Sequence, residues 1–183
     1  MTETVVLLHG FAGTGRLWDP VVGRLDRERY RPLAPDLRGH GSASSRRPVS
    51  FAGCVEDVLG LVAHPFVLAG YSMGGRIALH VALAAPERVE RLVLVATTAG
   101  IADPAERAQR RAADEAQAAA TERETIEAFA ERWVAQPLFD GTPPQAAELW
   151  RADILDNEPG ALAESLRGIG TGAMEPLWDR LGE

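Results

Sequence analysis

The chain has 183 residues, of which 46% are hydrophobic and 25% are charged, and its formal net charge at pH 7 is −7. This length and composition predict one globular domain with a sizeable core, and the acidic balance argues against a nucleic-acid or anionic-membrane partner. The single cysteine, Cys54, excludes an intrachain disulfide, and its apolar neighbours at helical spacing predict a buried side chain. We find no apolar run of membrane-spanning length and no signal-peptide pattern, so the expected location is the cytoplasm.

The first hundred residues alternate short β-rich runs with helical patterns. Each β-rich run is apolar nearly throughout, as is typical of strands covered on both faces of a parallel sheet. The four predicted strands span residues 4–8, 30–34, 66–69 and 91–96. The predicted helices between them span residues 20–26, 51–63 and 76–85. This series predicts a doubly wound α/β core over residues 1–100.

After Gly100 the pattern is helical. Asp103-Pro104-Ala105-Glu106 has the form of a capping box with proline at the first helical position, and Thr121-Glu122-Arg123-Glu124 has the form of a second one. Further short helices are separated by Pro137, Pro143 and Pro159. We expect residues 101–172 to form a helical lid over the carboxyl edge of the sheet, where open α/β folds bind ligands. Residues 173–183 are expected to begin a helix that returns to the core.

The stretch Gly70-Tyr71-Ser72-Met73-Gly74 joins the third predicted strand to a helix. Gly-x-Ser-x-Gly in that context is typical of a nucleophile elbow, in which a tight turn displays the serine hydroxyl at the edge of the sheet. His9-Gly10-Phe11-Ala12-Gly13 follows the first strand, where such proteins place one backbone donor of an oxyanion hole. The predicted donors are the N–H groups of Phe11 and Met73, and the predicted catalytic residue is Ser72.

A third cluster, Asp36-Leu37-Arg38-Gly39-His40-Gly41-Ser42, follows the second strand. We expect His40 to structure this loop rather than to act as a base. The three motifs in this order resemble the α/β-hydrolase superfamily. The resemblance implies the α/β-hydrolase fold and acyl-transfer or related chemistry, with Ser72 as nucleophile or base. Nothing in the sequence indicates a metal or an organic cofactor.

A narrower resemblance extends through the lid. The chain is similar to the family of 2-succinyl-6-hydroxy-2,4-cyclohexadiene-1-carboxylate synthases at Arg76, at residues 103–111, at Trp133 with residues 136–139, and at residues 165–168 and 170–172. This resemblance implies a lyase that eliminates pyruvate from a small polycarboxylate in menaquinone biosynthesis. The planar guanidinium of arginine can bind carboxylates through two hydrogen bonds. The substrate-binding residues that the resemblance implies are Tyr71, Arg76, Arg107, Arg110, Trp133 and Arg151.

A serine of this kind needs a histidine that is oriented by a carboxylate. The fold places them in the order serine, acid, histidine, and the only histidine after Ser72 is His80. It lies eight residues along the same predicted helix, about 12 Å away at a rise of roughly 1.5 Å per residue. His9, His40 and His64 precede the serine.

The last residues resemble the helix that precedes further strands in the family. We therefore expect a partial sheet of about four strands that lacks the last strands, the triad Asp and the triad His. The chain alone is then expected to be inactive. We also expect the apolar faces of residues 91–96 to be uncovered, so that isolated copies associate.

Two other functions stay open. The chain could belong to a generic esterase or lactonase with a helical lid, in which an apolar substrate would need no arginine cluster. It could also be a non-catalytic, truncated binding module that keeps the pocket. The sequence does not indicate an oligomeric state.

Overall fold

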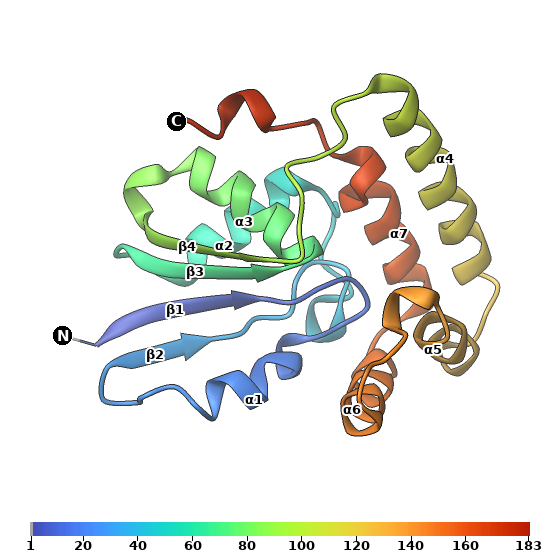
Figure 1. Cartoon of the computed structure of the whole chain (residues 1–183), viewed down its shortest axis with the longest axis horizontal. Helices are drawn as coiled ribbons and strands as arrows, with labels where there is room; N and C mark the ends of the chain where they lie inside the picture. The colour runs from blue at the N-terminus through green and yellow to red at the C-terminus, as the bar shows by residue number, and fades with distance from the viewer. Residues whose placement is uncertain (1) are drawn as a thin grey trace.

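The structure, a computed structural model that describes residues 2–183, is built on one parallel β-sheet (Figure 1). The strands lie in the order β2-β1-β3-β4 and span β1 Glu3–Leu8, β2 Tyr30–Leu33, β3 Phe66–Tyr71 and β4 Val89–Val95. All three pairings between neighbouring strands are parallel. Each strand overlaps its predicted run, and the sheet has the four strands that the sequence predicts.

Helices α2 (Phe51–Leu61) and α3 (Met73–Ala84) cover one face of the sheet. Their buried side chains pack against alternate strand residues such as Val6 and Leu68, because successive side chains of a strand point to opposite faces. Cys54 on α2 is fully buried in this layer, which confirms the prediction for the cysteine.

The second face has less cover. The short helices η1 (Gly15–Trp18) and α1 (Asp19–Val22) place Trp18 and Val22 against the strand residues of that face. The helix predicted over residues 20–26 is therefore wrong in extent, since α1 ends at Val22.

Strand β4 forms an edge of the sheet, and its side chains are largely uncovered. Val93, Leu94 and Val95 are 48%, 41% and 42% exposed. The prediction that the apolar faces of this segment lack cover is confirmed. The expectation that every strand is covered on both faces is wrong for β4, because Val93, Leu94 and Val95 stay exposed although α3 contacts the strand.

A layer of helices lies at the carboxyl ends of the strands (Figure 1). They span α4 Pro104–Thr121, α5 Ile126–Val134, α6 Pro144–Ile154 and α7 Pro159–Ile169. Helix α4 packs along α7, and α5 packs along α6. This placement is the one expected of a lid.

The two predicted helix starts in the lid had different outcomes. The Asp103 carboxylate accepts hydrogen bonds from the N–H groups of Ala105 and Glu106, as a helix N-cap does. The second prediction is wrong. Helix α4 continues through Thr121, and Thr125 caps α5 instead. The alanine-rich run before Thr121 favours continuation of α4.

Short 3-10 helices complete the chain, at η2 Gly41–Ala43, η3 Pro86–Arg88, η4 Pro137–Phe139, η5 Thr171–Ala173 and η6 Trp178–Arg180. The helix expected to begin in residues 173–183 is wrong, because the structure has only the short 3-10 helix η6 beyond η5. This segment does return to the core: Met174 and Leu177 are buried against α3, and the indole N–H of Trp178 donates to the carbonyl of Gly100 at 2.9 Å. Within residues 2–183, no helix combines the length and the apolar character needed to cross a membrane.

Candidate active site

Ser72 lies in the turn between β3 and α3, at the carboxyl edge of the sheet. Its backbone adopts φ 51°, a left-handed value that residues other than glycine rarely adopt. Two contacts hold this conformation: the Ser72 N–H donates to the carbonyl of Val95 at 2.9 Å, and the Thr97 hydroxyl donates to the carbonyl of Ser72 at 2.8 Å. The end of β4 therefore fixes the serine backbone.

The glycines on either side of Ser72 are required by close backbone contacts. A Cβ atom on Gly70 would lie 2.4 Å from the carbonyl oxygen of Gly74, and one on Gly74 would lie 2.3 Å from that of Leu8. Neither gap admits a carbon atom. The Gly-x-Ser-x-Gly spacing thus lets α3 start directly against β1 and β3.

The loop that follows β1 (residues 9–14, called here the β1 loop) approaches Ser72 from the neighbouring strand. Ala12 in this loop has φ 61°, which costs a residue with a Cβ roughly 1 kcal/mol. Among the described residues, no group accepts a hydrogen bond from the Phe11 N–H. Met73 begins α3, so its N–H has no acceptor within the helix.

A pocket of about 440 Å³, including its open mouth, lies beside Ser72. It is lined mainly by apolar and aromatic side chains from the β1 loop, the end of β3 and the lid, among them Phe11, Tyr71, Trp133, Phe139, Trp150 and Ile154. Neighbouring rings contact one another: the ring centroids of Phe11 and Trp133 are 5.0 Å apart, and those of Phe139 and Trp150 are 4.6 Å apart. Such edge-to-face contacts stabilise the pocket wall.

None of the four histidines is hydrogen-bonded to Ser72. His9 is buried and accepts from the Leu37 N–H while donating to the carbonyl of Gly10. His80 donates to the carbonyl of Arg76 at 2.8 Å and stacks on Phe51.

His9 and His40, which lie in the loops after β1 and β2, each stabilise their loop by hydrogen bonds. His40 is fully buried and bonds to the carbonyl of Arg38, as expected of a residue that structures its loop. Burial lowers the pKa of His9 to about 4 and that of His40 to about 3, so both are neutral at pH 7.

Each predicted substrate-binding arginine is engaged by a protein group. Arg107 pairs with Glu175, Arg110 with Asp114, and Arg151 with Glu131, while Arg76 donates to the carbonyl of Ile169 at 3.1 Å. Arg76 is 8% exposed and its Nε has no partner among the described residues. Burial, and then the nearby Arg110, lower its pKa to about 10, so it stays charged at neutral pH.

None of the four arginines is among the described residues that line the Ser72 pocket. Tyr71 and Trp133 do line it. The structure therefore brings the two predicted aromatic residues to Ser72, and the role of the arginines in substrate binding stays a prediction.

Comparison with known proteins assigns the family. Residues 5–182 match the alpha/beta hydrolase family. The chain belongs to the alpha/beta hydrolase family. The fold class and the superfamily that the sequence predicts are thereby confirmed.

Two relatives of this alpha/beta hydrolase match it along its whole length. A Bacillus subtilis protein assigned as a 2-succinyl-6-hydroxy-2,4-cyclohexadiene-1-carboxylate synthase is 37% identical, over all of this chain and 69% of the relative. The solved structure of MenH from S. aureus superposes with a TM-score of 0.91 at 31% identity, over 99% of this chain and 71% of that one. A pimeloyl-[acyl-carrier protein] methyl ester esterase of Nitrosomonas europaea is 39% identical, but over only 51% of this chain and 37% of its own.

Sequence reasoning missed two groups of residues in this alpha/beta hydrolase. The first is the pocket wall formed by Trp150 and Ile154 of α6; a tryptophan beside Arg151 on a predicted lid helix was the available signal. The second is a buried polar pair, Asp153 and Asn157, whose contacts reach residues about 140 positions earlier in the chain. Within residues 2–183, no cluster of His, Cys, Asp and Glu is arranged to hold a metal ion.

Proposed function

We propose that this chain is the Ser72-bearing part of a lyase that eliminates pyruvate from 2-succinyl-5-enolpyruvyl-6-hydroxy-3-cyclohexene-1-carboxylate in menaquinone biosynthesis. The observation that carries the proposal is the similarity to the B. subtilis synthase over the whole chain, lid included, with a TM-score of 0.91 to MenH. The esterase similarity covers only half of the chain. In this proposal residues 1–100 are the core, residues 101–172 the lid and residues 173–183 a return to the core.

The reaction can be read from the names of substrate and product. The ring loses the hydrogen at C2 and the enolpyruvyl oxygen at C5, and its double bond at C3 is replaced by bonds at C2 and C4. The C2 hydrogen lies between the succinyl carbonyl and the ring double bond, so it leaves as a proton. Its electron pair shifts through the ring as the C5–O bond breaks, and pyruvate departs as its enolate, which then takes up one proton to become pyruvate.

Negative charge develops on the succinyl carbonyl oxygen when the C2 proton leaves. The free N–H groups of Phe11 and Met73 would form the oxyanion hole that stabilises this charge. Ser72, displayed between them in a nucleophile elbow, would accept the proton. The aromatic walls of the pocket, Tyr71 and Trp133 among them, would hold the ring.

Ser72 cannot act as a base unaided, because a hydroxyl is a weak base without a paired histidine. Within residues 2–183, every histidine is engaged elsewhere or lies outside hydrogen-bond reach of Ser72. The expected activity of the 183-residue chain by itself is therefore negligible.

The arginines would bind the carboxylates. Arg110 and Arg151 lie on the lid and are 48% and 43% exposed, and a substrate carboxylate would replace Asp114 or Glu131 as their partner. The Arg151–Glu131 pair is exposed on both sides and contributes little, roughly 0–1 kcal/mol, so Arg151 makes the exchange readily. The Asp114 side chain is only 5% exposed, so its exchange at Arg110 costs more.

An esterase or lactonase is the second candidate. It is favoured by the apolar lining of the Ser72 pocket, in which no arginine takes part among the described residues. An ester with an apolar acyl group would fit that lining without any ion pair.

Titration of the 15N-labelled chain with the intact substrate separates the two candidates. For the lyase, Arg76→Ala and Arg110→Ala should each weaken substrate binding about tenfold, as expected on loss of one charge-assisted contact. Arg24→Ala is the control, because its side chain bonds only to the carbonyl of Pro20 at the surface. Unchanged affinity in both test variants would favour the esterase.

A further inference from the structure

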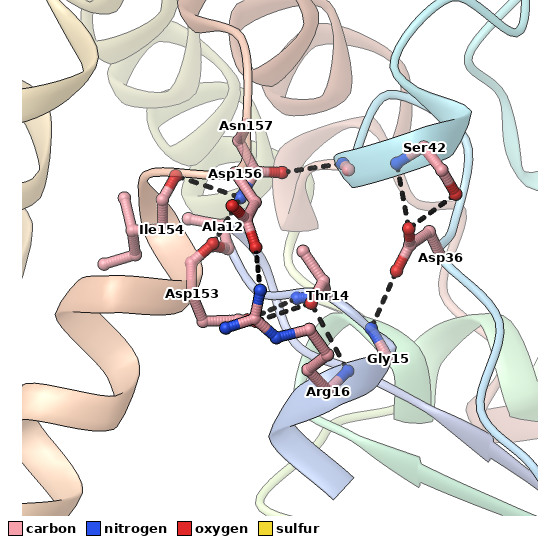
Figure 2. Close-up of polar contacts among 11 residues, drawn as sticks. Ala12, Thr14, Gly15, Arg16, Asp36, Ser42, Asp153, Ile154, Asp156 and Asn157 are labelled. Carbon is pink, nitrogen blue, oxygen red and sulfur yellow. Dashed lines mark hydrogen bonds and ion pairs between the residues drawn. The ribbon is translucent and has the colours of Figure 1, made fainter. Parts of the chain in front are cut away.

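The turn that joins α6 to α7 in the lid is bonded directly to the β1 loop. Figure 2 shows that the link consists of two lid residues, Asp153 near the end of α6 and Asn157 in the turn. Both side chains are almost fully buried, at 2% and 4% exposure. Because burial of a polar side chain is unfavourable unless it is bonded, the contacts of these two residues define what the link does.

Asp153 holds Thr14 at two points. The Thr14 N–H donates to Oδ2 of Asp153 at 2.6 Å, and the Thr14 hydroxyl donates to Oδ1 at 2.5 Å. Hydrogen bonds to an ionised carboxylate are shorter and stronger than neutral ones. Two bonds to one residue fix both its position and its orientation, so the carboxyl end of the β1 loop is tied to α6.

Asn157 holds the middle of the same loop. Its Nδ2 donates to the carbonyl of Ala12 at 3.1 Å, and its Oδ1 accepts from the N–H of Gly41 at 3.0 Å (Figure 2). Ala12 is the residue with φ 61°. A left-handed residue that is not glycine persists only where its surroundings hold it. The bond to its carbonyl oxygen supplies that restraint.

Other contacts do not replace this link. Asp36 accepts from the N–H of Gly15 at 2.8 Å, which anchors the start of η1 rather than the loop before it. Among the described residues, the side-chain hydrogen bonds that reach backbone atoms of Ala12 and Thr14 from outside the loop come from the lid. The lid thus sets the conformation of the segment that contains Phe11.

We propose that Asp153 and Asn157 are positioning residues that hold the β1 loop with the Phe11 N–H directed toward Ser72. The inference rests on the proposed function, which assigns that N–H to the oxyanion hole. Neither side chain contacts the substrate. They act through Thr14 and Ala12. Without them, Ala12 relaxes toward the right-handed region and the adjacent Phe11 N–H turns away.

Amide NMR of the 15N-labelled chain with phenylphosphonate as the probe tests this inference. The phenyl ring suits the aromatic pocket and the phosphonate oxygens suit two N–H donors. In the wild-type chain we expect the amide signals of Phe11 and Met73 both to shift on titration. In Asp153→Ala and Asn157→Ala, affinity should fall about tenfold, the value of one or two lost bonds to a charged or buried group. The Phe11 shift should be lost while the Met73 shift is retained.

Two further variants separate positioning from folding. Asp153→Asn can accept from the Thr14 N–H and donate to the Thr14 hydroxyl, so it should restore the Phe11 shift. Ser44→Ala removes an exposed hydrogen bond from the Ser44 hydroxyl to Glu158 near the same turn, without touching Asp153 or Asn157, and should behave as wild type. The inference is overturned if Phe11 responds equally in all variants, or if Phe11 and Met73 lose their shifts together. No response at either amide in the wild type would overturn both the inference and the oxyanion hole of the proposed function.

Discussion

Gly74→Ala tests how closely the Ser72 turn packs against β1. A Cβ atom at this position would lie 2.3 Å from the carbonyl oxygen of Leu8 and 2.6 Å from that of His9. Both are backbone atoms at the end of β1, the strand that is paired on both sides, so they cannot move aside singly. Overpacking costs about 1–3 kcal/mol, and rigid backbone neighbours place this site at the upper end. The better helix propensity of alanine returns about 1 kcal/mol, which leaves a loss of about 2 kcal/mol.

Urea unfolding followed by circular dichroism measures this loss in the free energy of unfolding. In a thermal melt of a chain of this size, about 2 kcal/mol corresponds to a fall in Tm of roughly 4–8 °C. Gly60→Ala on α2 is the matched control, because a Cβ there meets nothing within 4 Å; it should gain about 0.5–1 kcal/mol. If Gly74→Ala were as stable as the wild type, the close approach of α3 to β1 would be refuted.

Three other predictions follow from the structure. The 183-residue chain should release pyruvate from the substrate no faster than Ser72→Ala, in an assay coupled to NADH oxidation; an ordinary enzymatic rate would contradict the histidine assignment. Burial lowers the pKa of His9 to about 4 and that of His40 to about 3, so between pH 6.5 and 4 the unfolded state binds a proton at each site that the folded state does not. Each histidine should therefore lower the free energy of unfolding by up to about 3 kcal/mol as pH drops from 6.5 to 4. Urea titrations at several pH values measure this fall; a flat wild-type profile would contradict it. The exposed β4 edge should cause association at tens of micromolar by light scattering, and Val93→Lys with Val95→Lys should reduce it; equal association in the variant would place the contact elsewhere.

Local patterns in the sequence were sufficient to predict the sheet and the Ser72 turn. Glycines at positions 70 and 74 predict a turn without room for side chains. The structure confirms this, because a Cβ atom added at either position would lie too close to a backbone oxygen. Apolar runs predict the strands because parallel strands are commonly buried on both faces, although β4 keeps its apolar run with Val93, Leu94 and Val95 exposed. The prediction that a helix starts at Thr121 is wrong because Thr125, four residues later, can cap a helix equally well and does so. Local sequence did not distinguish the two threonines.

The contacts between lid and core could not be predicted in the same way. Asp153 and Thr14 are 139 residues apart, and neither residue type in isolation signals a partner. The arginines illustrate the same limit. The family resemblance implied a basic pocket, but whether Arg110 faces Asp114 or a ligand depends on helix packing that periodicity does not encode.

A crystal structure of the chain with the intact substrate tests the central claim most directly, since a chain without a base for Ser72 should leave that substrate unreacted. We expect the ring between Tyr71 and Trp133, with C2 facing the Ser72 hydroxyl. The succinyl carbonyl oxygen should lie about 3 Å from the N atoms of both Phe11 and Met73. A substrate bound away from the Ser72 pocket, or one whose succinyl carbonyl points away from both amides, would contradict the proposed function.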